Sequence, residues 1–530
     1  MIGVVPDTPL TIPGLLARAV ADHGDRIYAI SPTGRLTYCQ AEQRSAELAR
    51  WMLALGVGKG TRVGLFFAND IEWIIWWLAA SRIGAVAVPL STMYRPAELA
   101  KVVRLADVGL LVAPARVLDI DVAARLEAAF PGLADQRADR LSLPAAPFLR
   151  RIALTSGARV AWASRCADDT DDGADDTDDG DDRVGADVLA SAEAEVSAAD
   201  LAIMVHTSGS TADPKGVLHT HGTLVRQTST WPAAIRAVTG SQDPPVIVCA
   251  MPLFWIGGVL AVMGAMHEAV TLLLMPRLDA GVALDLAEAE RATGIVGWPA
   301  FTQRMREHPS FAGRDLSSAP MLRHGPLDIA MTDVPDGYPV HRTMSETAGG
   351  FAYTDIAVVD DGGTPVADGV VGELLVRGIG VMAGYNKKER WETFDADGWY
   401  HTGDRVYRRT GDPRLFYVGR STELIKTSGA NVSPLEVEAV IGEFDGVAQC
   451  VVVGVHHPER GEEVCAVVVG GTAQLDLEAL ARRARDVLSP YKVPTRWIPV
   501  SSAQIPTLPS GKLNRKALRD WVVGSVLSGQ

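Results

Sequence analysis

The sequence predicts an α/β fold followed by a smaller α+β domain. Residues 36–70 give a helical apolar pattern that ends at Gly56 and is followed by a short β-rich run, and residues 71–90 repeat the order of helix and strand. Such alternation favours a sheet covered by helices. A length of 530 residues exceeds one ordinary core, so we expect roughly three or four structural units.

The character of the chain changes after Gly419. Residues 446–471 contain two strand-like runs, residues 475–489 have the apolar period of an amphipathic helix, and residues 505–520 form a Gly- and Pro-marked loop that leads into a helix. These patterns predict a separate α+β domain. The predicted divisions are an N-terminal domain over 1–418, a hinge over 419–423 and a C-terminal domain over 424–530.

Composition excludes several classes of protein. Hydrophobic residues make up 47% and charged residues 22% of the chain, which is typical of a globular protein. The five cysteines lack the paired spacing of a disulfide or zinc framework, which indicates a reducing compartment. No basic segment precedes an apolar core at the N-terminus, so we expect a cytoplasmic protein without a secretory signal.

The net charge of −14 is concentrated in one acidic tract. Residues 167–182 contain ten aspartates and repeat ADDTDDG, which predicts a solvated, disordered insertion. A calcium loop is the alternative, but Thr170 occupies a ligand position and the terminal glutamate is missing. Nothing basic enough to mark a nucleic-acid surface remains in the rest of the chain.

Residues 246–266 carry no charge over 21 positions, a length that could cross a bilayer. Pro252 and the Gly257-Gly258 pair interrupt the run. These breakers favour a buried strand, a turn and the start of a buried helix. We therefore expect no transmembrane segment.

The stretch TSGSTADPKG at 207–216 has the composition of a phosphate-binding loop. It does not fit the Walker pattern, because Pro214 precedes Lys215 and Gly216 follows it. Glycines still let the backbone approach an anion, and successive amides, hydroxyls and one lysine can donate to it. By itself the loop indicates either anion binding or a polar turn.

Six further segments occur in the order expected for one known family. The loop and these segments resemble the adenylate-forming superfamily, in particular its acyl-CoA synthetase and fatty-acid–CoA ligase branch. The segments are GAVAVPLSTMYRPAEL at 84–99, MPLFWIGG at 251–258, TMSETAGG at 343–350, GWYHTGD at 398–404, GRSTELIKTSGANVSPLEVE at 419–438 and LPSGKLNRKALR at 508–519. The resemblance implies a large N-terminal domain of α/β subdomains with a small β-rich subdomain, and a small mobile C-terminal lid.

The resemblance also implies an ATP site. Its residues would be Thr207, Ser208, Gly209, Ser210, Thr211, Lys215, Arg342, Met344, Ser345, Asp404, Arg420 and Lys512. The implied catalytic residues are Lys512, Glu346 and Thr207: Lys512 would reach the α-phosphate and the substrate carboxylate, while Glu346 and Thr207 would hold Mg²⁺. Asp404 would accept hydrogen bonds from the ribose hydroxyls, and Arg420 would donate toward the ribose or the phosphates.

The implied reaction has two steps. A carboxylic acid attacks the α-phosphorus of ATP and gives an acyl-adenylate and pyrophosphate, and a thiol then displaces AMP. Between the steps the small domain would turn about Glu423. Coenzyme A is the expected thiol, with Lys426 and Gly429 beside it, although a glycine that only turns the backbone is the alternative for Gly429. A separate carrier protein is the alternative acceptor, and a homodimer is a further possible assembly.

The acyl pocket would be lined by Trp255, Gly257 and Gly325, and its apolar character suggests a fatty or other hydrophobic acid. Trp255 replaces a histidine that is common in the family, so it would shorten or gate the acyl tunnel, or it packs in the core.

Other departures weaken the expectation of full activity. Ala212 replaces a usual glycine, Arg342-Thr343 replace an aromatic–glycine pair, and the region 323–378 is short. A nucleotide-binding scaffold that adenylates poorly, with the acidic tract as its interaction segment, is therefore a hypothesis of a different class.

Overall fold

The computed structural model describes most of the chain. It does not describe residues 1–7, 158, 166–183, 208–212, 230, 233–242, 298, 320–321, 323–353, 421–423, 471–474, 502–503, 507–512 and 528–530, nor the side chains of 299–300, 412–414, 417–420, 516 and 525–527. The acidic tract at 167–182 thus lies outside the described residues.

The chain divides into two compact units. The first contains residues 1–92, 100–205 and 216–419, and the second contains residues 93–99, 206–215 and 420–530. The domain limits and the hinge at 419–423 stay predictions of the sequence. Each unit is described by itself below.

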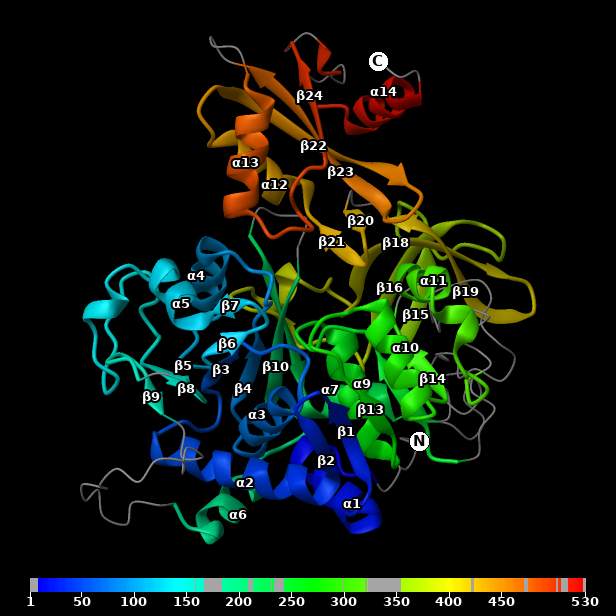
Figure 1. Cartoon of the computed structure of the whole chain (residues 1–530). Coiled ribbons are helices and arrows are strands. Elements are labelled where there is room, and N and C mark those ends of the chain that lie inside the picture. The colour runs from blue at the N-terminus through cyan, green and yellow to red at the C-terminus, as the bar shows by residue number, and fades with distance from the viewer. Residues whose placement is uncertain are drawn as a thin grey trace. The chain divides into compact units, whose positions relative to one another are not determined.

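An eight-stranded sheet forms the centre of the first unit (Figure 1). Its order is β17-β11-β10-β4-β3-β5-β8-β9, and the six strands from β10 to β9 run parallel. The strands are β3 (Arg62–Leu65), β4 (Val86–Pro89), β5 (Leu110–Ala113), β8 (Arg151–Leu154), β9 (Ser164–Arg165), β10 (Leu201–Thr207), β11 (Lys215–Thr220) and β17 (Gly384–Tyr385). β3, β4, β5 and β8 are almost entirely buried, as expected for parallel strands covered on both faces.

A second sheet of the same unit has five strands in the order β14-β12-β13-β1-β2. They are β1 (Ile27–Ser31), β2 (Gly34–Thr37), β12 (Val246–Cys249), β13 (Thr271–Leu273) and β14 (Gly294–Val296). All are parallel except β2, which forms an antiparallel hairpin with β1.

Helix α3 (Ile71–Arg82) contacts both sheets, with β3 and β4 of one and β1 and β2 of the other (Figure 1). Every residue of α3 except Glu72 is buried, including three tryptophans. A helix that is apolar on all sides is stable only when it is covered on all sides. Helices α1 (Ile12–His23), α2 (Tyr38–Ala54) and α9 (Ile256–His267) share its core.

The remaining helices of the first unit cover the two sheets or join their strands. They are α4 (Pro96–Leu105, whose first turn belongs to the second unit), α5 (Val122–Ala129), α6 (Ala186–Ala194), α7 (His221–Thr228), α10 (Ala280–Ala289) and α11 (Pro299–Glu307), with short 3₁₀ helices at Leu133–Asp135, Phe311–Gly313 and Arg390–Glu392. A two-stranded ribbon of β6 (Arg116–Val117) and β7 (Ile120–Asp121) lies before α5.

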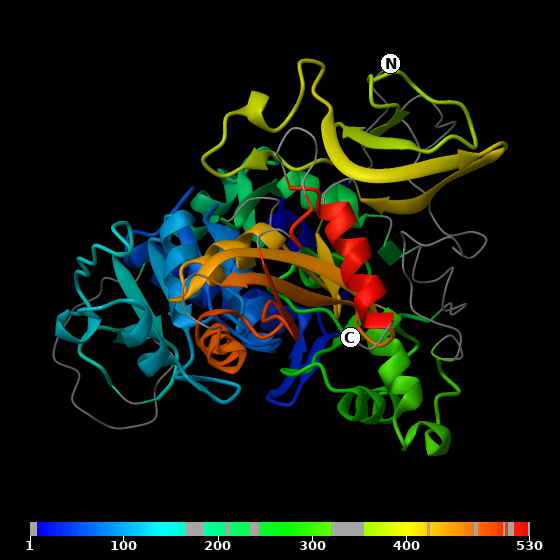
Figure 2. The same cartoon turned by 90° about the horizontal axis from the view of Figure 1, so that it is seen from above.

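A β-rich part follows in the same unit. The antiparallel sheet β15-β16-β18-β19 consists of β15 (Asp355–Val359), β16 (Gly372–Arg377), β18 (Tyr400–Arg409) and β19 (Asp412–Arg420). Seen from above, β18 and β19 run side by side as the two longest strands of this sheet (Figure 2).

The second unit is an α+β structure. Its sheet contains β20 (Ile425–Thr427), β21 (Ala430–Val432), β22 (Val447–His457), β23 (Gly461–Gly470) and β24 (Arg496–Val500). Helices α12 (Pro434–Gly442) and α13 (Leu477–Val487) pack on one face, and α14 (Arg515–Leu527) packs on the other. Alternate residues of β22 and β23 supply the two apolar layers, as the strand period requires.

A buried lysine organises polar contacts in the second unit. Lys492 Nζ donates to Glu98 Oε1 at 2.8 Å and to Glu436 Oε1 at 2.7 Å, and its side chain is only 3% exposed. Ser489 donates to Glu98 Oε2. Burial by itself lowers the pKa of Lys492, but the electrostatic effects of Tyr491, Glu436 and Glu98 outweigh it and raise the pKa above its usual value. The ammonium therefore stays charged, which a buried carboxylate pair requires.

The structure confirms the predicted α/β class with a smaller α+β part. Residues 246–266 form β12, a connection and α9, as the breakers Pro252 and Gly257-Gly258 indicated. Within the described residues, no helix combines the length and the apolar character that crossing a membrane would need.

One buried side chain fixes the approach to α9. Asn69, 3% exposed, donates from Nδ2 to the carbonyl of Met251 and accepts from the N–H of Leu253, both at 2.8 Å. Since each partner left unsatisfied costs about 1–3 kcal/mol, we expect Asn69→Ala to lower the free energy of unfolding by about 2–4 kcal/mol. Urea unfolding measures this. Gln303→Ala, which removes an exposed amide that donates to Glu307, is the control and should change stability by less than about 0.5 kcal/mol.

A buried histidine predicts acid sensitivity. His221 is fully buried, its Nδ1 accepts from the N–H of Ile12 at 3.2 Å, and burial lowers its pKa to about 4. The unfolded chain, with the ordinary histidine pKa of about 6.5, therefore binds more protons between these values. The stability from His221 is fully present above pH 6.5 and falls by up to about 1.4 kcal/mol per pH unit toward pH 4.

Urea midpoints measured at several pH values between 7.5 and about 4.5 test this expectation. His221→Asn should show a flatter pH dependence than the wild type, and His456→Asn, at an exposed position on β22, should not. An equally steep loss of stability in His221→Asn would contradict the assignment.

Candidate functional site

The predicted phosphate loop connects two neighbouring strands. Thr207 is the last residue of β10, Lys215 is the first of β11, and these strands are adjacent in the sheet. The connection over 208–214 is too short for a parallel crossover, so the strands form a hairpin and both residues lie at its loop end. Thr207 is exposed and Lys215 is half-buried.

Positive charge at this loop comes from Lys215 and not from His206, the residue before Thr207. His206 is 7% exposed, and burial lowers the pKa of its imidazole to about 4. It is therefore neutral at physiological pH. Gly216 follows the lysine, and a Cβ there would lie 2.8 Å from Met204 Sδ and 3.2 Å from Asn386 Cβ. A larger residue at position 216 would therefore require the side chains of Met204 and Asn386 to shift.

Asp404 lies on a bulge of β18. Glu373 of β16 pairs with Arg405, and Leu375 pairs with His401, so the three residues 402–404 lie opposite the single residue Leu374. Gly403 has φ +71°, a left-handed conformation that glycine adopts without strain. Bulges of this kind re-aim side chains beside functional sites.

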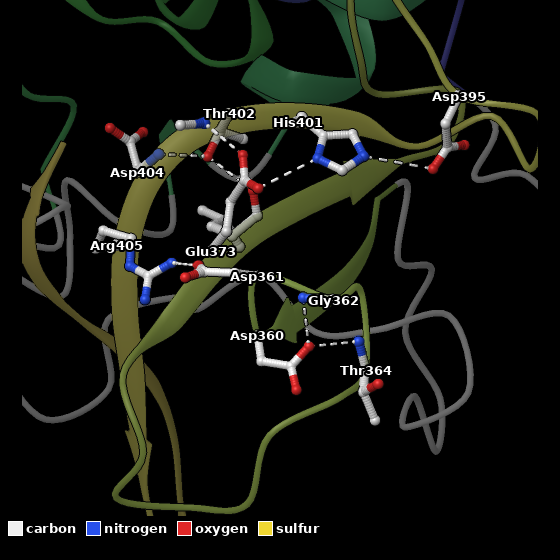
Figure 3. Close-up of polar contacts among 12 residues, drawn as sticks. Asp360, Asp361, Gly362, Thr364, Glu373, Asp395, His401, Thr402, Asp404 and Arg405 are labelled. Carbon is white, nitrogen blue, oxygen red and sulfur yellow. Dashed lines mark hydrogen bonds and ion pairs between the residues drawn. The ribbon is translucent and has the colours of Figure 1, made fainter. Parts of the chain in front are cut away.

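Side chains satisfy the backbone of this bulge (Figure 3). Glu373 Oε1 accepts from the N–H of Gly403 at 3.1 Å, and Thr402 Oγ1 accepts from the N–H of Asp404 at 3.0 Å. The Thr402 hydroxyl donates to the carbonyl of Leu374 at 2.8 Å. In Figure 3 the carboxylate of Asp404 points away from Glu373. The bulge therefore presents Asp404 while side chains hold the residues before it.

His401 lies between two carboxylates. Its Nδ1 is 3.2 Å from Glu373 Oε2 and its Nε2 is 3.5 Å from Asp395 Oδ2 (Figure 3). Asp395 also accepts from the N–H groups of Asp397 and Trp399 at 3.0 and 2.8 Å, which fixes the turn before β18. This chain of contacts joins the start of β18 to the bulge.

The predicted acyl-pocket residues lie at the start of α9. Trp255 is the residue before the helix, is half-buried and packs edge-to-face against Phe254. A Cβ on Gly257 would lie 2.1 Å from Met251 Cε, so the Met251 side chain covers this glycine. Asn69 holds the backbone on which Met251 lies, as described above.

Lys426 and Gly429 share the hairpin of β20 and β21 in the second unit. Lys426 is exposed, and its N–H donates to Glu462 Oε2 at 2.8 Å. Ser428 and Gly429 have φ +50° and +84°, the two positive angles of a type I′ turn. The turn is thus a sufficient conformational reason for glycine at 429, and a contact with coenzyme A stays a prediction.

Described residues on both sides of position 512 form polar contacts. The N–H of Asn514 donates to the carbonyl of Pro506 at 2.9 Å. Arg515 then forms a two-pronged pair with both carboxylate oxygens of Glu438 and donates to the carbonyl of Val452 at 3.0 Å. The start of α14 is therefore fixed to α12 and β22.

Several predicted residues lie outside the described part of the chain or lack a described side chain. The first group is Ser208, Gly209, Ser210, Thr211, Gly325, Arg342, Met344, Ser345, Glu346, Glu423 and Lys512, and the second is Arg420, which ends β19. The shortened region 323–378 and the substitutions at 212 and 342–343 are likewise outside it in large part.

No metal centre can be assembled from the described residues, among which no group of three or more His, Cys, Asp or Glu side chains could hold a metal ion. Glu346 is outside this set. The predicted magnesium ligands therefore rest on the sequence, with the exposed hydroxyl of Thr207 as the one described member.

Sequence reasoning missed Glu373, His401 and Thr402. A signal for Glu373 was present, because a charged residue interrupts the apolar run VVGELLV at 370–376. His401 and Thr402 lie inside the GWYHTGD segment, which was used only to assign Asp404.

Family models match both units. The model described as "AMP-binding enzyme" matches residues 16–327, and the one described as "AMP-binding enzyme C-terminal domain" matches residues 436–512.

Curated relatives align over nearly the full chain. A Mycobacterium tuberculosis propanoyl:CoA ligase, whose acyl group carries a 7a-methyl-1,5-dioxo-octahydro-1H-inden-4-yl substituent, is 29% identical over 96% of this chain and 98% of its own. A feruloyl-CoA synthase of Amycolatopsis sp. is 29% identical over 91% and 93%. The long-chain-fatty-acid–CoA ligase FadD13 of Mycobacterium tuberculosis is 26% identical over 93% and 94%.

Solved structures share the fold. The amide bond synthetase McbA from Marinactinospora thermotolerans aligns with a TM-score of 0.71 at 24% identity, over 96% of this chain and 99% of that one. A double mutant of o-succinylbenzoate CoA synthetase from Bacillus subtilis aligns with a TM-score of 0.69 at 20% identity, over 96% and 98%.

The turn at Gly429 can be tested apart from any ligand. An L-residue at φ +84° is strained, so we expect Gly429→Ala to lower the free energy of unfolding by about 1–2 kcal/mol. Gly442→Ala, at the end of α12 with nothing within 4 Å of the added Cβ, is the control and should be neutral or slightly stabilising. Thermal unfolding of both variants gives the comparison, and equal stability would show that the turn does not require glycine.

Proposed function

Since the chain belongs to the AMP-binding enzyme family, we propose that it is an ATP-dependent carboxylate–CoA ligase that forms an acyl-adenylate and releases pyrophosphate and AMP. The match of both family models, over 16–327 and 436–512, carries this proposal. The relatives named above as CoA ligases and synthases align over more than nine-tenths of both chains, which supports the same activity.

The nucleotide would be held from several strand ends. The backbone and hydroxyls of 207–211 and the ammonium of Lys215 would bind the β- and γ-phosphates, and the hairpin geometry of β10 and β11 supports this role. Asp404 would accept from the ribose hydroxyls, which suits a carboxylate with two acceptor oxygens. Arg342, Met344, Ser345 and Arg420 complete the proposed ATP site.

Thr207 and Glu346 would hold Mg²⁺, whose charge would offset that of the triphosphate. A hydroxyl and a carboxylate are hard oxygen ligands, and Thr207 is exposed at the strand end, as such a ligand must be.

Lys512 would act in the first step. As the substrate carboxylate attacks the α-phosphorus, negative charge builds on the phosphoryl oxygens, and a positioned ammonium stabilises it. The Arg515–Glu438 pair supports this role because it fixes the start of α14, three residues after the lysine in the sequence.

In the second step a thiol would attack the acyl carbonyl and AMP would leave. Coenzyme A is the proposed thiol, with Lys426 and Gly429 beside its pantetheine arm. Between the two steps the small domain would rotate about Glu423. This rotation would move Lys512 away from the reacting atoms and bring the thiol site to them. A cytoplasmic location agrees with the cysteine pattern of the sequence.

A fatty or other hydrophobic acid is the proposed substrate. Most apolar residues of α9 are buried in the core. Ile256 and Leu260 of this helix, and Met251 and Trp255 before it, are only half-buried. Positions 256 and 260 lie one turn apart on the same face of the helix. With Gly257 and Gly325 this face supports an apolar acyl site, and Trp255 would limit its length.

Lys512→Ala tests the proposal directly. We expect carboxylate-dependent release of pyrophosphate to fall at least about 100-fold, because the loss of one such donor typically costs 10²–10³ in rate. Lys388→Ala removes an exposed lysine that pairs with Glu392 and should leave the rate unchanged. Unchanged turnover in Lys512→Ala would contradict the assignment.

A panel of carboxylic acids in the same assay would identify the substrate class. Consumption of coenzyme A distinguishes the proposed ligase from an acyl-AMP ligase that serves a carrier protein. Tight ATP binding without isotope exchange between pyrophosphate and ATP, over the whole panel, would instead favour a scaffold that binds nucleotide.

A further inference from the structure

The bulge of β18 interrupts the regular hydrogen bonding between β18 and β16. Because residues 402–404 oppose only Leu374, the N–H groups of Gly403 and Asp404 have no regular partner on β16. An unpaired, partly buried N–H costs free energy comparable to a lost hydrogen bond. Both groups are satisfied by side chains, Gly403 by Glu373 and Asp404 by Thr402.

Glu373 is placed to hold the bulge from two directions. Its side chain is 23% exposed, Oε1 accepts from the N–H of Gly403 and Oε2 lies 3.2 Å from His401 Nδ1. His401 in turn lies 3.5 Å from Asp395, which fixes the turn before the strand. One carboxylate therefore contacts residues on both sides of Thr402, and the hydroxyl of Thr402 fixes the residue between them to β16.

We propose that Glu373 is a positioning residue for nucleotide binding: by anchoring Gly403 and His401, it sets the direction in which the bulge presents the carboxylate of Asp404 to the ribose of ATP. The inference rests on the proposed function, since it takes Asp404 as the ribose acceptor. Glu373 itself points toward His401 and away from the Asp404 carboxylate (Figure 3), and it accepts from the N–H of Gly403. Its effect is therefore carried by the backbone.

The difference in affinity between ATP and 2′-deoxy-ATP measures whether Asp404 is placed to bind the ribose. A hydrogen bond from a hydroxyl to a carboxylate is worth about 1.5–3 kcal/mol, which corresponds to roughly 10- to 100-fold in affinity at 1.4 kcal/mol per decade. We expect the wild type to bind ATP at least about 10-fold more tightly than 2′-deoxy-ATP by calorimetry. Glu373→Ala should bring the two dissociation constants within about 3-fold of each other, mainly by weakening the binding of ATP. The KM for the acid should stay within about 2-fold of the wild-type value.

Two variants separate positioning from folding. Glu373→Gln keeps an acceptor oxygen for Gly403 and should keep most of the discrimination. Glu373→Asp keeps the charge but is one methylene shorter, so it should lose the discrimination even if Glu373→Ala does not fold. Asp361→Ala is the matched control, since it removes the partner of Arg405 on the same sheet, where Asp361 is 92% exposed, without touching the bulge.

Asp404→Asn distinguishes this inference from the proposed function. Loss of discrimination in Asp404→Asn but not in folded Glu373→Ala or Glu373→Asp would overturn the positioning role and leave the ribose assignment in place. Wild-type discrimination in Asp404→Asn, or none in the wild type, would overturn the ribose assignment and with it this inference. Equal loss in Asp361→Ala would show a general effect of the sheet and also overturn it.

Discussion

The burial of helix α3 is the constraint on which the first unit depends. Its sequence IEWIIWWLAASR leaves only Glu72 outside the core, so water cannot solvate any broad face of the helix. The helix contacts strands of both main sheets, and α1, α2 and α9 share its apolar cluster. Two sheets that meet around one apolar helix cannot shift independently without exposing tryptophan surface, which costs roughly 25 cal/mol per Å².

The polar start of α3 extends this constraint to the candidate acyl site. Asp70 caps the helix and accepts from Ser31 and Thr33 of the β1–β2 hairpin, while the neighbouring Asn69 holds Met251 and Leu253. The backbone before Trp255 is thus fixed by Asn69, in addition to the hydrogen bond from the N–H of Trp255 to the carbonyl of Pro252 within the loop. A side chain that defines a binding surface is precise only when its support is rigid, and here the support is the same helix that joins the sheets.

The parts of the fold that the sequence predicted are those with a local signal. The helix and strand patterns over 36–90 and 446–520 are set by apolar spacing, and Pro252 with Gly257-Gly258 distinguished a buried strand and helix from a membrane span. The positions of Asp404 and of the 207–216 loop came from motifs. The charge inside the apolar run 370–376 marks Glu373 as unusual, but its role depends on the register of β16 against β18, where its partners lie 28 and 30 residues away in the chain. Register is a property of paired strands and is not written in either strand alone.

Gly429 and Gly403 show why a motif residue has to be interpreted with its backbone. Both have positive φ angles, +84° and +71°, so the chain conformation alone accounts for glycine at each position. At 429 the turn would exist without any ligand, and the glycine does not by itself indicate a thiol site. At 403 the conformation also turns the following carboxylate out of the ladder. Glu373 and Thr402 accept from the N–H groups of Gly403 and Asp404, and His401 contacts Glu373. Several polar side chains therefore stabilise this bulge, and the residue that the bulge turns out of the ladder is Asp404.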